Sequence, residues 1–157
     1  MNIIIASDYR GTAVQKRILE HFRAAPAGMP AHTIHEVRQF DEDTDYPDIA
    51  AYVAKAVTDG TFERGILICG TGIGMCVAAN KFPGVRAAPC HNEVVAELSR
   101  KHNDSNILCL SGDLLGDRAV IAVVNVWLET PFEGGRHSNR VGKIRQIEFA
   151  NYTAEQI

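Results

Sequence analysis

RGILICGTGIGMCVAANK, residues 64–81, joins a short apolar run to a run with helical spacing through three glycines at alternate positions. The apolar part, residues 64–69, predicts a buried strand, and the segment from within GTGIG to about Lys81 predicts a helix. A buried strand that leads directly into a helix is the building unit of α/β proteins. The stretch therefore predicts a parallel α/β fold if the same unit recurs along the chain.

The unit does recur on both sides of this stretch. Further strands are predicted at 3–6, 33–40, 84–90 and 106–110, and further helices at 12–24, 49–57, 92–102 and 116–128. Pro47 suits the first turn of the helix that continues over 49–57. A Pro- and Gly-rich connection at 25–32 separates the first helix from the second strand. Such alternation needs right-handed crossovers and places helices on both faces of the sheet. We therefore predict a doubly wound, Rossmann-like α/β fold with five parallel strands. An extra C-terminal helix at 141–152 would pack outside the sheet or against another subunit.

Composition limits the class of protein. The chain has 157 residues, of which 46% are hydrophobic and 22% charged, and a formal net charge of −3. These values are typical of a globular protein, and we expect one domain over residues 1–157. No basic excess points to nucleic acid, and no apolar stretch approaches membrane-spanning length. Without a signal-like N-terminus we expect a cytoplasmic protein whose four cysteines, which lack CxxC spacing, are reduced.

Ligands of open parallel sheets bind at the carboxyl ends of the strands. Several polar or reactive residues follow the predicted strands directly. They are Ser7, Asp8 and Tyr9, then Cys69, Gly70 and Thr71, then Cys90 and His91, and finally Ser111, Gly112 and Asp113. We therefore expect the functional site at this edge of the sheet.

The glycine loop matches no nucleotide-binding fingerprint. Gly70, Gly72 and Gly74 spell GxGxG, but Met75 stands where the dinucleotide motif needs a third glycine, and no GK[ST] follows for a P-loop. Free N–H groups at a helix start still bind an anion, such as a phosphate, a carboxylate or an oxygen that is charged only during reaction. The alternative is that the glycines only turn a tight corner between strand and helix.

Cys69, His102 and two arginines are candidates for chemistry. A thiol near a helix N-terminus is able to form a thiolate that serves as base or nucleophile, although a cysteine that ends a buried strand is also a common small apolar residue. His102 lies where the fourth helix should end, so it is either an acid/base or a helix cap. Arg136 and Arg140 are four residues apart and would share one helix face, to bind phosphate or to pair with surface carboxylates.

A metal site is not expected. His32, His35 and Glu36 spell HxxHE, which is not the order of a zinc protease, and they fall on a weak strand. The acidic residues from Asp41 to Asp48 are interpreted as a solvated loop. We therefore expect neither a metal nor another cofactor.

Taken together, six segments closely resemble one family in order and spacing. The segments are SDYRG, DYPD, ICGTGIGMCVAANK, GVRAA, SRKHNDSNIL and TPFEGGRHSNRV, and the similarity extends from about residue 2 to residue 148. The family is that of ribose-5-phosphate isomerase B, which includes the galactose-6-phosphate isomerase subunits. The resemblance implies a five-stranded doubly wound fold, a homodimer or homotetramer with active sites at the subunit interface, and metal-free isomerisation of an aldose to a ketose.

The resemblance also implies roles for individual residues. Cys69 would be the base that moves a proton between C1 and C2, and His102 would open the sugar ring. The amides of Gly70, Gly72 and Gly74 would hold the enediolate, with Thr71 assisting. Substrate contacts would come from the remaining residues, with the two arginines on the phosphate: Asp8, Asn103, Arg136 and Arg140.

Two positions depart from the family pattern. Tyr9 stands where the family has histidine, and Asp113 stands where many members have arginine. Both positions are associated with the phosphate end of the substrate, and an aspartate there is repulsive unless it is paired. Arg10, in place of an alanine, would either supply the missing charge or pair with Asp113. Tyr9 is either a substrate contact or a packing residue.

The leading hypothesis is an isomerase that converts ribose 5-phosphate to ribulose 5-phosphate. The alternatives are an isomerase of another tetrose, pentose or hexose phosphate, and a non-catalytic module that binds a sugar phosphate without removing a proton. Cys69, His102 and Asn103 together favour the enzyme over the binding module.

Overall fold

The computed structural model of the chain describes residues 1–24, 32–37, 40–41 and 43–152. Five parallel strands form one sheet in the order β2-β1-β3-β5-β4. The strands are β1 (Asn2–Ser7), β2 (Thr33–Glu36), β3 (Arg64–Cys69), β4 (Ala87–Pro89) and β5 (Ile107–Ser111). The helices are α1 (Thr12–Arg23), α2 (Tyr46–Thr58), α3 (Ile73–Ala79), α4 (Glu93–Asn103), α5 (Asp117–Glu129) and α6 (Arg136–Asn151). The predicted doubly wound α/β fold is confirmed.

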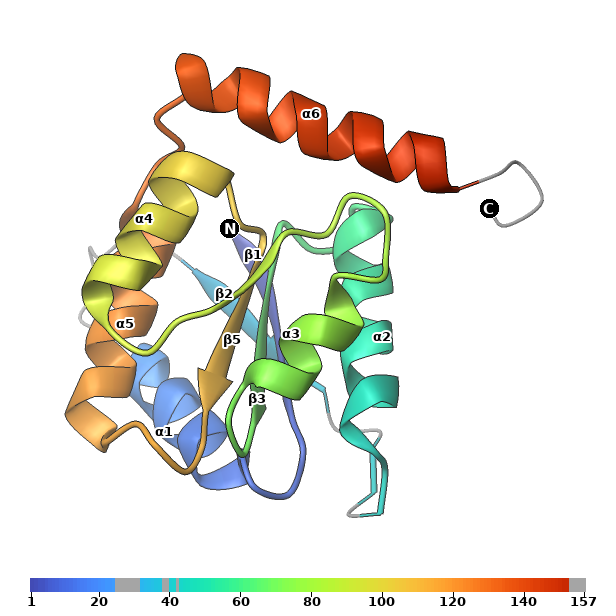
Figure 1. Cartoon of the computed structure of the whole chain (residues 1–157). Coiled ribbons are helices and arrows are strands. Elements are labelled where there is room, and N and C mark those ends of the chain that lie inside the picture. Colours follow the sequence, from blue (N-terminus) through green and yellow to red (C-terminus); the bar gives the residue numbers. More distant parts are fainter. Residues whose placement is uncertain (25–31, 38–39, 42, 153–157) are drawn as a thin grey trace.

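Helices cover both faces of the sheet, α1, α4 and α5 on one side and α2 and α3 on the other (Figure 1). The alternation of side chains along β1 explains why both faces are apolar. Ile3 and Ile5 pack into the core beneath α1 and α5, whereas Ile4 packs into the core beneath α2. β3 and β5 are also almost completely buried, as expected for central strands of a parallel sheet.

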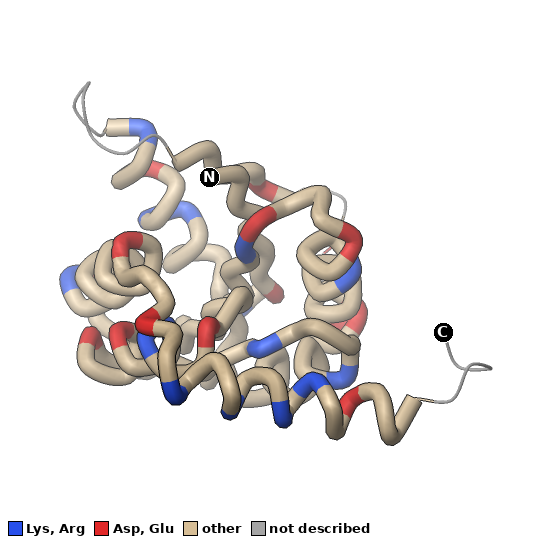
Figure 2. The backbone as a smooth tube through the Cα atoms, turned by 90° about the horizontal axis from the view of Figure 1, so that it is seen from above, with Lys and Arg blue, Asp and Glu red and all other residues tan. Residues whose placement is uncertain are grey.

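The last helix, α6, lies across the amino ends of the strands (Figure 1). It begins at Arg136, so the predicted start at Val141 was five residues late. Gly135, with φ 55°, precedes its first turn, and His137 is the one buried residue that the structure describes in this helix. The helix carries Lys and Arg along its length (Figure 2). No helix among the described residues is long and apolar enough to cross a membrane.

Three other predicted boundaries differ by three or more residues. β4 has three residues instead of the predicted seven, because Gly84 turns with φ +84° and the Asn106 side chain accepts a hydrogen bond from the Arg86 N–H at 2.7 Å. α2 begins at Tyr46, three residues before the apolar periodicity of 49–57, and Pro47 lies in its first turn as predicted, where a missing N–H costs no helical hydrogen bond. β2 ends at Glu36; residues 38–39 of that predicted strand, and 25–31 of the predicted connection, lie outside the described residues.

Candidate active site

The loop between β3 and α3 holds the Cys69 sulfur against its own backbone. Cys69 is 5% exposed, and its Sγ accepts a hydrogen bond from the Gly72 N–H at 3.2 Å. Gly72 adopts φ +78°, and a Cβ there would lie 3.0 Å from the Leu110 backbone, so this position needs glycine. Among the described residues, the neighbouring Thr71 N–H has no hydrogen-bond acceptor. The Gly72 amide is thus directed at the sulfur, and the preceding amide, of Thr71, is available to a ligand.

The loop forms the floor of a cleft of about 580 Å³ at the carboxyl ends of β1 and β3. Its lining comes from three segments that lie far apart in the sequence. They are Asp8, Tyr9 and Arg10 after β1, then Asp43, Thr44, Asp45 and Tyr46 before and at the start of α2, and Cys69, Gly70, Thr71 and Gly74. This is the edge at which the sequence predicts the site, and the size suits a small sugar derivative.

Two glycines allow side chains to lie directly on the loop. A Cβ at Gly70 would lie 2.8 Å from the Arg10 Nε and 3.0 Å from the Asp113 Oδ2. A Cβ at Gly74 would lie 2.7 Å from the ring of Tyr46. These close approaches, and not the corner alone, explain why the loop carries glycine at both positions.

The Arg10 guanidinium pairs with the Asp113 carboxylate, which is one of the two roles considered for Arg10. The hydrogen bond and the charge of Asp113 raise the pKa of Arg10 above its ordinary value. The Asp113 backbone N–H in turn donates to the Gly70 carbonyl at 3.1 Å. Asp113 is thereby paired, so it does not place an isolated negative charge at the cleft.

Most residues predicted for this end of the sheet do lie together. Asp8, Cys69, Gly70, Thr71 and Gly74 line the cleft, as does Tyr9, which is 70% exposed. Gly72 lies beneath the loop, where its N–H meets the sulfur. The Asp8 Oδ1 accepts hydrogen bonds from the N–H groups of Arg10 and Gly11, and this fixes the turn after β1.

Tyr46 was missed as a site residue. Its ring packs on Gly74 inside the cleft and is 41% exposed. The sequence DYPD indicated only the start of a helix. A contact between residues 46 and 74 depends on how α2 and α3 pack, so no local pattern carries it.

The remaining predicted residues lie at the opposite edge of the sheet. His102 and Asn103 end α4, directly before the amino end of β5, whereas Cys69 pairs with Ser111 at its carboxyl end. β5 alone spans about 16 Å at 3.3 Å per residue. Arg136 and Arg140 lie on α6, which crosses the same amino edge (Figure 1). A proton-transferring group must come within hydrogen-bond reach of its target, so His102 and Cys69 of one chain cannot serve the same substrate carbon.

At this second edge, the ring of His102 stacks on the ring of His137 with centroids 4.2 Å apart and planes 3° apart. Glu133 adds a carboxylate oxygen 3.9 Å from the His102 Nε2. Burial, with the charges of His102 and Arg136, lowers the pKa of His137. The Arg136 Nε donates to the His137 Nε2 at 3.4 Å. The lowered pKa and the donated hydrogen bond both favour the neutral form of the His137 ring beneath His102.

His102, Glu133 and His137 are also the one described group whose ligand atoms could hold a metal ion, since these atoms lie within 4.8 Å of one another. The ring geometry disfavours this use. A metal ligand must point its lone pair at the ion within its own ring plane, and two parallel stacked rings do not direct their lone pairs at a common point. The arrangement suits a histidine that binds or moves a proton better than it suits a metal site.

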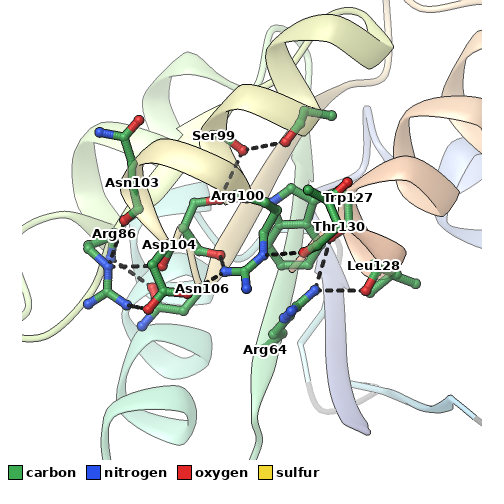
Figure 3. Close-up of polar contacts among 12 residues, drawn as sticks. Arg64, Arg86, Ser99, Arg100, Asn103, Asp104, Asn106, Trp127, Leu128 and Thr130 are labelled. Atoms are coloured by element: carbon green, nitrogen blue, oxygen red, sulfur yellow. Dashed lines mark hydrogen bonds and ion pairs between the residues drawn. The ribbon is translucent and has the colours of Figure 1, made fainter. Parts of the chain in front are cut away.

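A buried arginine network fixes the end of α4 that carries His102 (Figure 3). Arg100 is 5% exposed, and its guanidinium donates to Asp104 at 2.9 Å and to the Ser105 carbonyl at 2.6 Å. The Trp127 indole donates to the Ser105 hydroxyl at 2.8 Å. Arg64 lies over the same indole, and burial lowers its pKa to about 10. The network ties α4 to β5 and α5, and this gives the histidine a rigid base.

Comparisons with known sequences and structures identify relatives of the chain. The sequence profile of the Ribose/Galactose Isomerase family matches residues 3–144. Ribose-5-phosphate isomerase B of Clostridium thermocellum has a similar structure, with a TM-score of 0.89 and 41% identity over 97% of this chain and 100% of that chain. Ribose-5-phosphate isomerase B of Mycoplasma genitalium with bound ribulose-5-phosphate is also similar, with a TM-score of 0.83 and 42% identity over 94% of this chain and 96% of that chain.

A further relative, D-erythrulose-4-phosphate isomerase of Pectobacterium atrosepticum, is 43% identical over 107 residues, which are 68% of this chain and 70% of that protein. The profile match over residues 3–144 includes the β3–α3 loop and nearly all of the sheet. The chain therefore belongs to the ribose/galactose isomerase family, whose members interconvert aldoses and ketoses.

Proposed function

We propose that this protein converts ribose 5-phosphate to ribulose 5-phosphate through an enediolate, with Cys69 as the base. The observation that carries the proposal is the hydrogen bond from the Gly72 N–H to the Cys69 Sγ in the floor of the cleft. This N–H holds the sulfur at the floor of the cleft, and a thiolate is the form of cysteine that accepts a proton.

In the open-chain aldose, the Cys69 thiolate removes the proton from C2. The electron pair moves toward the C1 carbonyl, and the resulting oxyanion is held by amides of residues 70–74, with the Thr71 N–H free to donate. The sulfur then returns its proton to C1, while the proton on O2 is lost and O1 gains one, to give the ketose. The amides supply the positive charge that an ion would otherwise supply, so the proposed reaction needs no metal.

The proposed ring-opening residue is His102, in a site completed by a second copy of the chain. His102, Asn103, Arg136 and Arg140 lie at the far edge of the sheet from Cys69. A homodimer that places this edge over the partner's cleft would bring a proton donor and two phosphate ligands to the thiolate. On this proposal residues 1–157 form one catalytic domain, and each active site is built from the domains of two chains.

A second candidate is an isomerase of a shorter sugar phosphate. The specific observation in its favour is that Tyr9 and Arg10, which both depart from the family pattern, line the cleft, where Arg10 pairs with Asp113. The Pectobacterium relative named for D-erythrulose 4-phosphate shows that the family is not limited to pentoses.

The test is exchange of deuterium from solvent into C2 of ribose 5-phosphate, erythrose 4-phosphate and allose 6-phosphate. Replacement of the sulfur, Cys69→Ala, is expected to lower the rate by about 10²- to 10⁴-fold with little change in substrate affinity. The matched control is Cys76→Ala, because Cys76 is another buried thiol but does not line the cleft. Exchange that continues at the wild-type rate in Cys69→Ala would remove this residue from its role. Absence of exchange with every sugar in the wild type would favour a binding module.

A further inference from the structure

Arg10 has an unusual position in the cleft. Among the described residues that line it, Arg10 is the one with a cationic side chain, whereas Asp8, Asp43 and Asp45 contribute carboxylates. An anionic substrate that enters this cleft therefore meets one positive group from the chain that supplies the thiol. The phosphate of a sugar phosphate carries the permanent charge of the substrate and needs such a partner.

The guanidinium of Arg10 is fixed before a substrate arrives. It lies against Gly70, the residue after the proposed base, where a Cβ would be 2.8 Å from its Nε and 2.9 Å from its Cζ. The Asp113 carboxylate pairs with its NH2 group, and Asp113 is itself anchored to Gly70 through a backbone hydrogen bond of 3.1 Å. The side chain is thus held on the cleft wall and kept from folding onto the lining carboxylates.

Pairing with Asp113 leaves donors over. A guanidinium has five N–H donors in a rigid planar fork, and the hydrogen bond to Asp113 comes from the NH2 group. The Arg10 side chain lines the cleft and remains 51% exposed, so the pair with Asp113 does not cover it. This geometry suits the bidentate binding of a phosphate.

Building on the proposed function, we infer that Arg10, positioned by Asp113, binds the phosphate group of the substrate from within the chain that supplies Cys69. The position adds a phosphate contact that the far-edge arginines do not provide. Asp113 then acts as a positioning residue for Arg10, and its charge moderates the affinity for the anion.

The experiment compares Arg10→Ala, Arg10→Lys and Asp113→Asn with the wild type. The quantities are KM and kcat for the sugar phosphate that shows the fastest exchange, and the inhibition constant of inorganic phosphate as a competitor. Arg10→Ala is expected to raise both KM and the inhibition constant about 10- to 100-fold while kcat stays within about threefold. The KM and inhibition constant of Arg10→Lys should lie between those of the wild type and Arg10→Ala, because lysine keeps the charge but lacks the planar fork of donors.

Asp113→Asn separates phosphate binding from a purely structural pair. The amide keeps a hydrogen-bond acceptor for Arg10 and removes one negative charge, so KM should stay the same or fall. The matched control is Arg17→Ala, which breaks the exposed Arg17–Asp117 pair of 2.8 Å away from the cleft and should leave KM and the inhibition constant unchanged.

The inference is overturned if Arg10→Ala leaves KM and phosphate inhibition at wild-type values, or if it lowers kcat alone. It is also overturned if Arg10→Ala and Asp113→Asn raise KM and lower the melting temperature to the same extent, as a structural pair would. Calorimetric titration with inorganic phosphate measures phosphate binding directly, without depending on turnover. An inactive wild type that still binds phosphate through Arg10 would contradict the proposed function and not this inference.

Discussion

Mixing two inactive variants tests whether the active site crosses the subunit interface. The variants are Cys69→Ala, which removes the proposed base, and His102→Gln, which removes the proposed ring-opening group. In one chain these residues lie at opposite ends of β5, about 16 Å apart over the strand alone. If each site takes Cys69 from one chain and His102 from its partner, neither variant has a complete site by itself.

The expected activity of the mixture follows from counting sites. In a mixed dimer, one site combines the intact cysteine of the His102→Gln chain with the intact histidine of the Cys69→Ala chain, and the other site carries both substitutions. Random reassociation of equal amounts makes about half of the dimers mixed, so about one quarter of all sites are intact. The mixture should therefore recover about one quarter of the wild-type specific activity.

The assay is to denature and refold the two variants together, with each variant refolded alone and with refolded wild type as controls. Activity is measured on ribose 5-phosphate with saturating substrate. Sites built within one chain would each carry one substitution in a mixed dimer, so activity would stay at the level of the separate variants. That result would refute the reasoning from topology and remove the second copy from the proposed site.

Two further outcomes are expected from the far edge of the sheet. Arg100→Met should lower the free energy of unfolding, measured in urea, by about 2–4 kcal/mol, because it leaves the buried Ser105 carbonyl without its donor. The control Arg17→Met should lower it by less than about 1 kcal/mol. Equal losses in the two variants would contradict a stabilising role of the network. His137 has a lowered pKa in the folded state, so the unfolded state binds more protons once the pH falls below about 6.5, and stability should fall from pH 7 toward pH 5. A His137→Asn variant should show a weaker fall over that range, and an unchanged profile would show that other groups cause it.

The local sequence predicts the elements of this fold well where one pattern dominates. RGILIC is apolar over its whole length because β3 lies in the middle of a sheet covered on both faces, and the predicted strand has the observed bounds. The start of α6 was missed because its first turn, RHSNR, has no apolar periodicity. That turn is set by the positive φ of Gly135 and the burial of His137 under α4, and both depend on the tertiary structure.

The site was predictable at its loop and less so around it. Cys69 and the three glycines predict an anion-binding turn from the local sequence alone. The contacts that complete the cleft join residues far apart in the chain, Arg10 with Asp113 and Tyr46 with Gly74. The Arg10–Asp113 contact depends on strand order, since β1, β3 and β5 are consecutive in the sheet and not in the sequence. The Tyr46–Gly74 contact depends on how α2 and α3 pack.

The charges at the two edges of the sheet are complementary, and this bears on how two chains would meet. The cleft edge carries Asp8, Asp43 and Asp45, while α6 at the other edge carries Arg136, Arg140, Lys143 and Arg145 against Glu148 (Figure 2). In a twofold dimer the same two surfaces meet twice, so a basic edge facing an acidic cleft is satisfied at both sites. The lining carboxylates would then be offset by arginines of the partner, and the phosphate would bind between those arginines and Arg10. Salt should weaken phosphate binding and chain association together, because both depend on the same exposed charges.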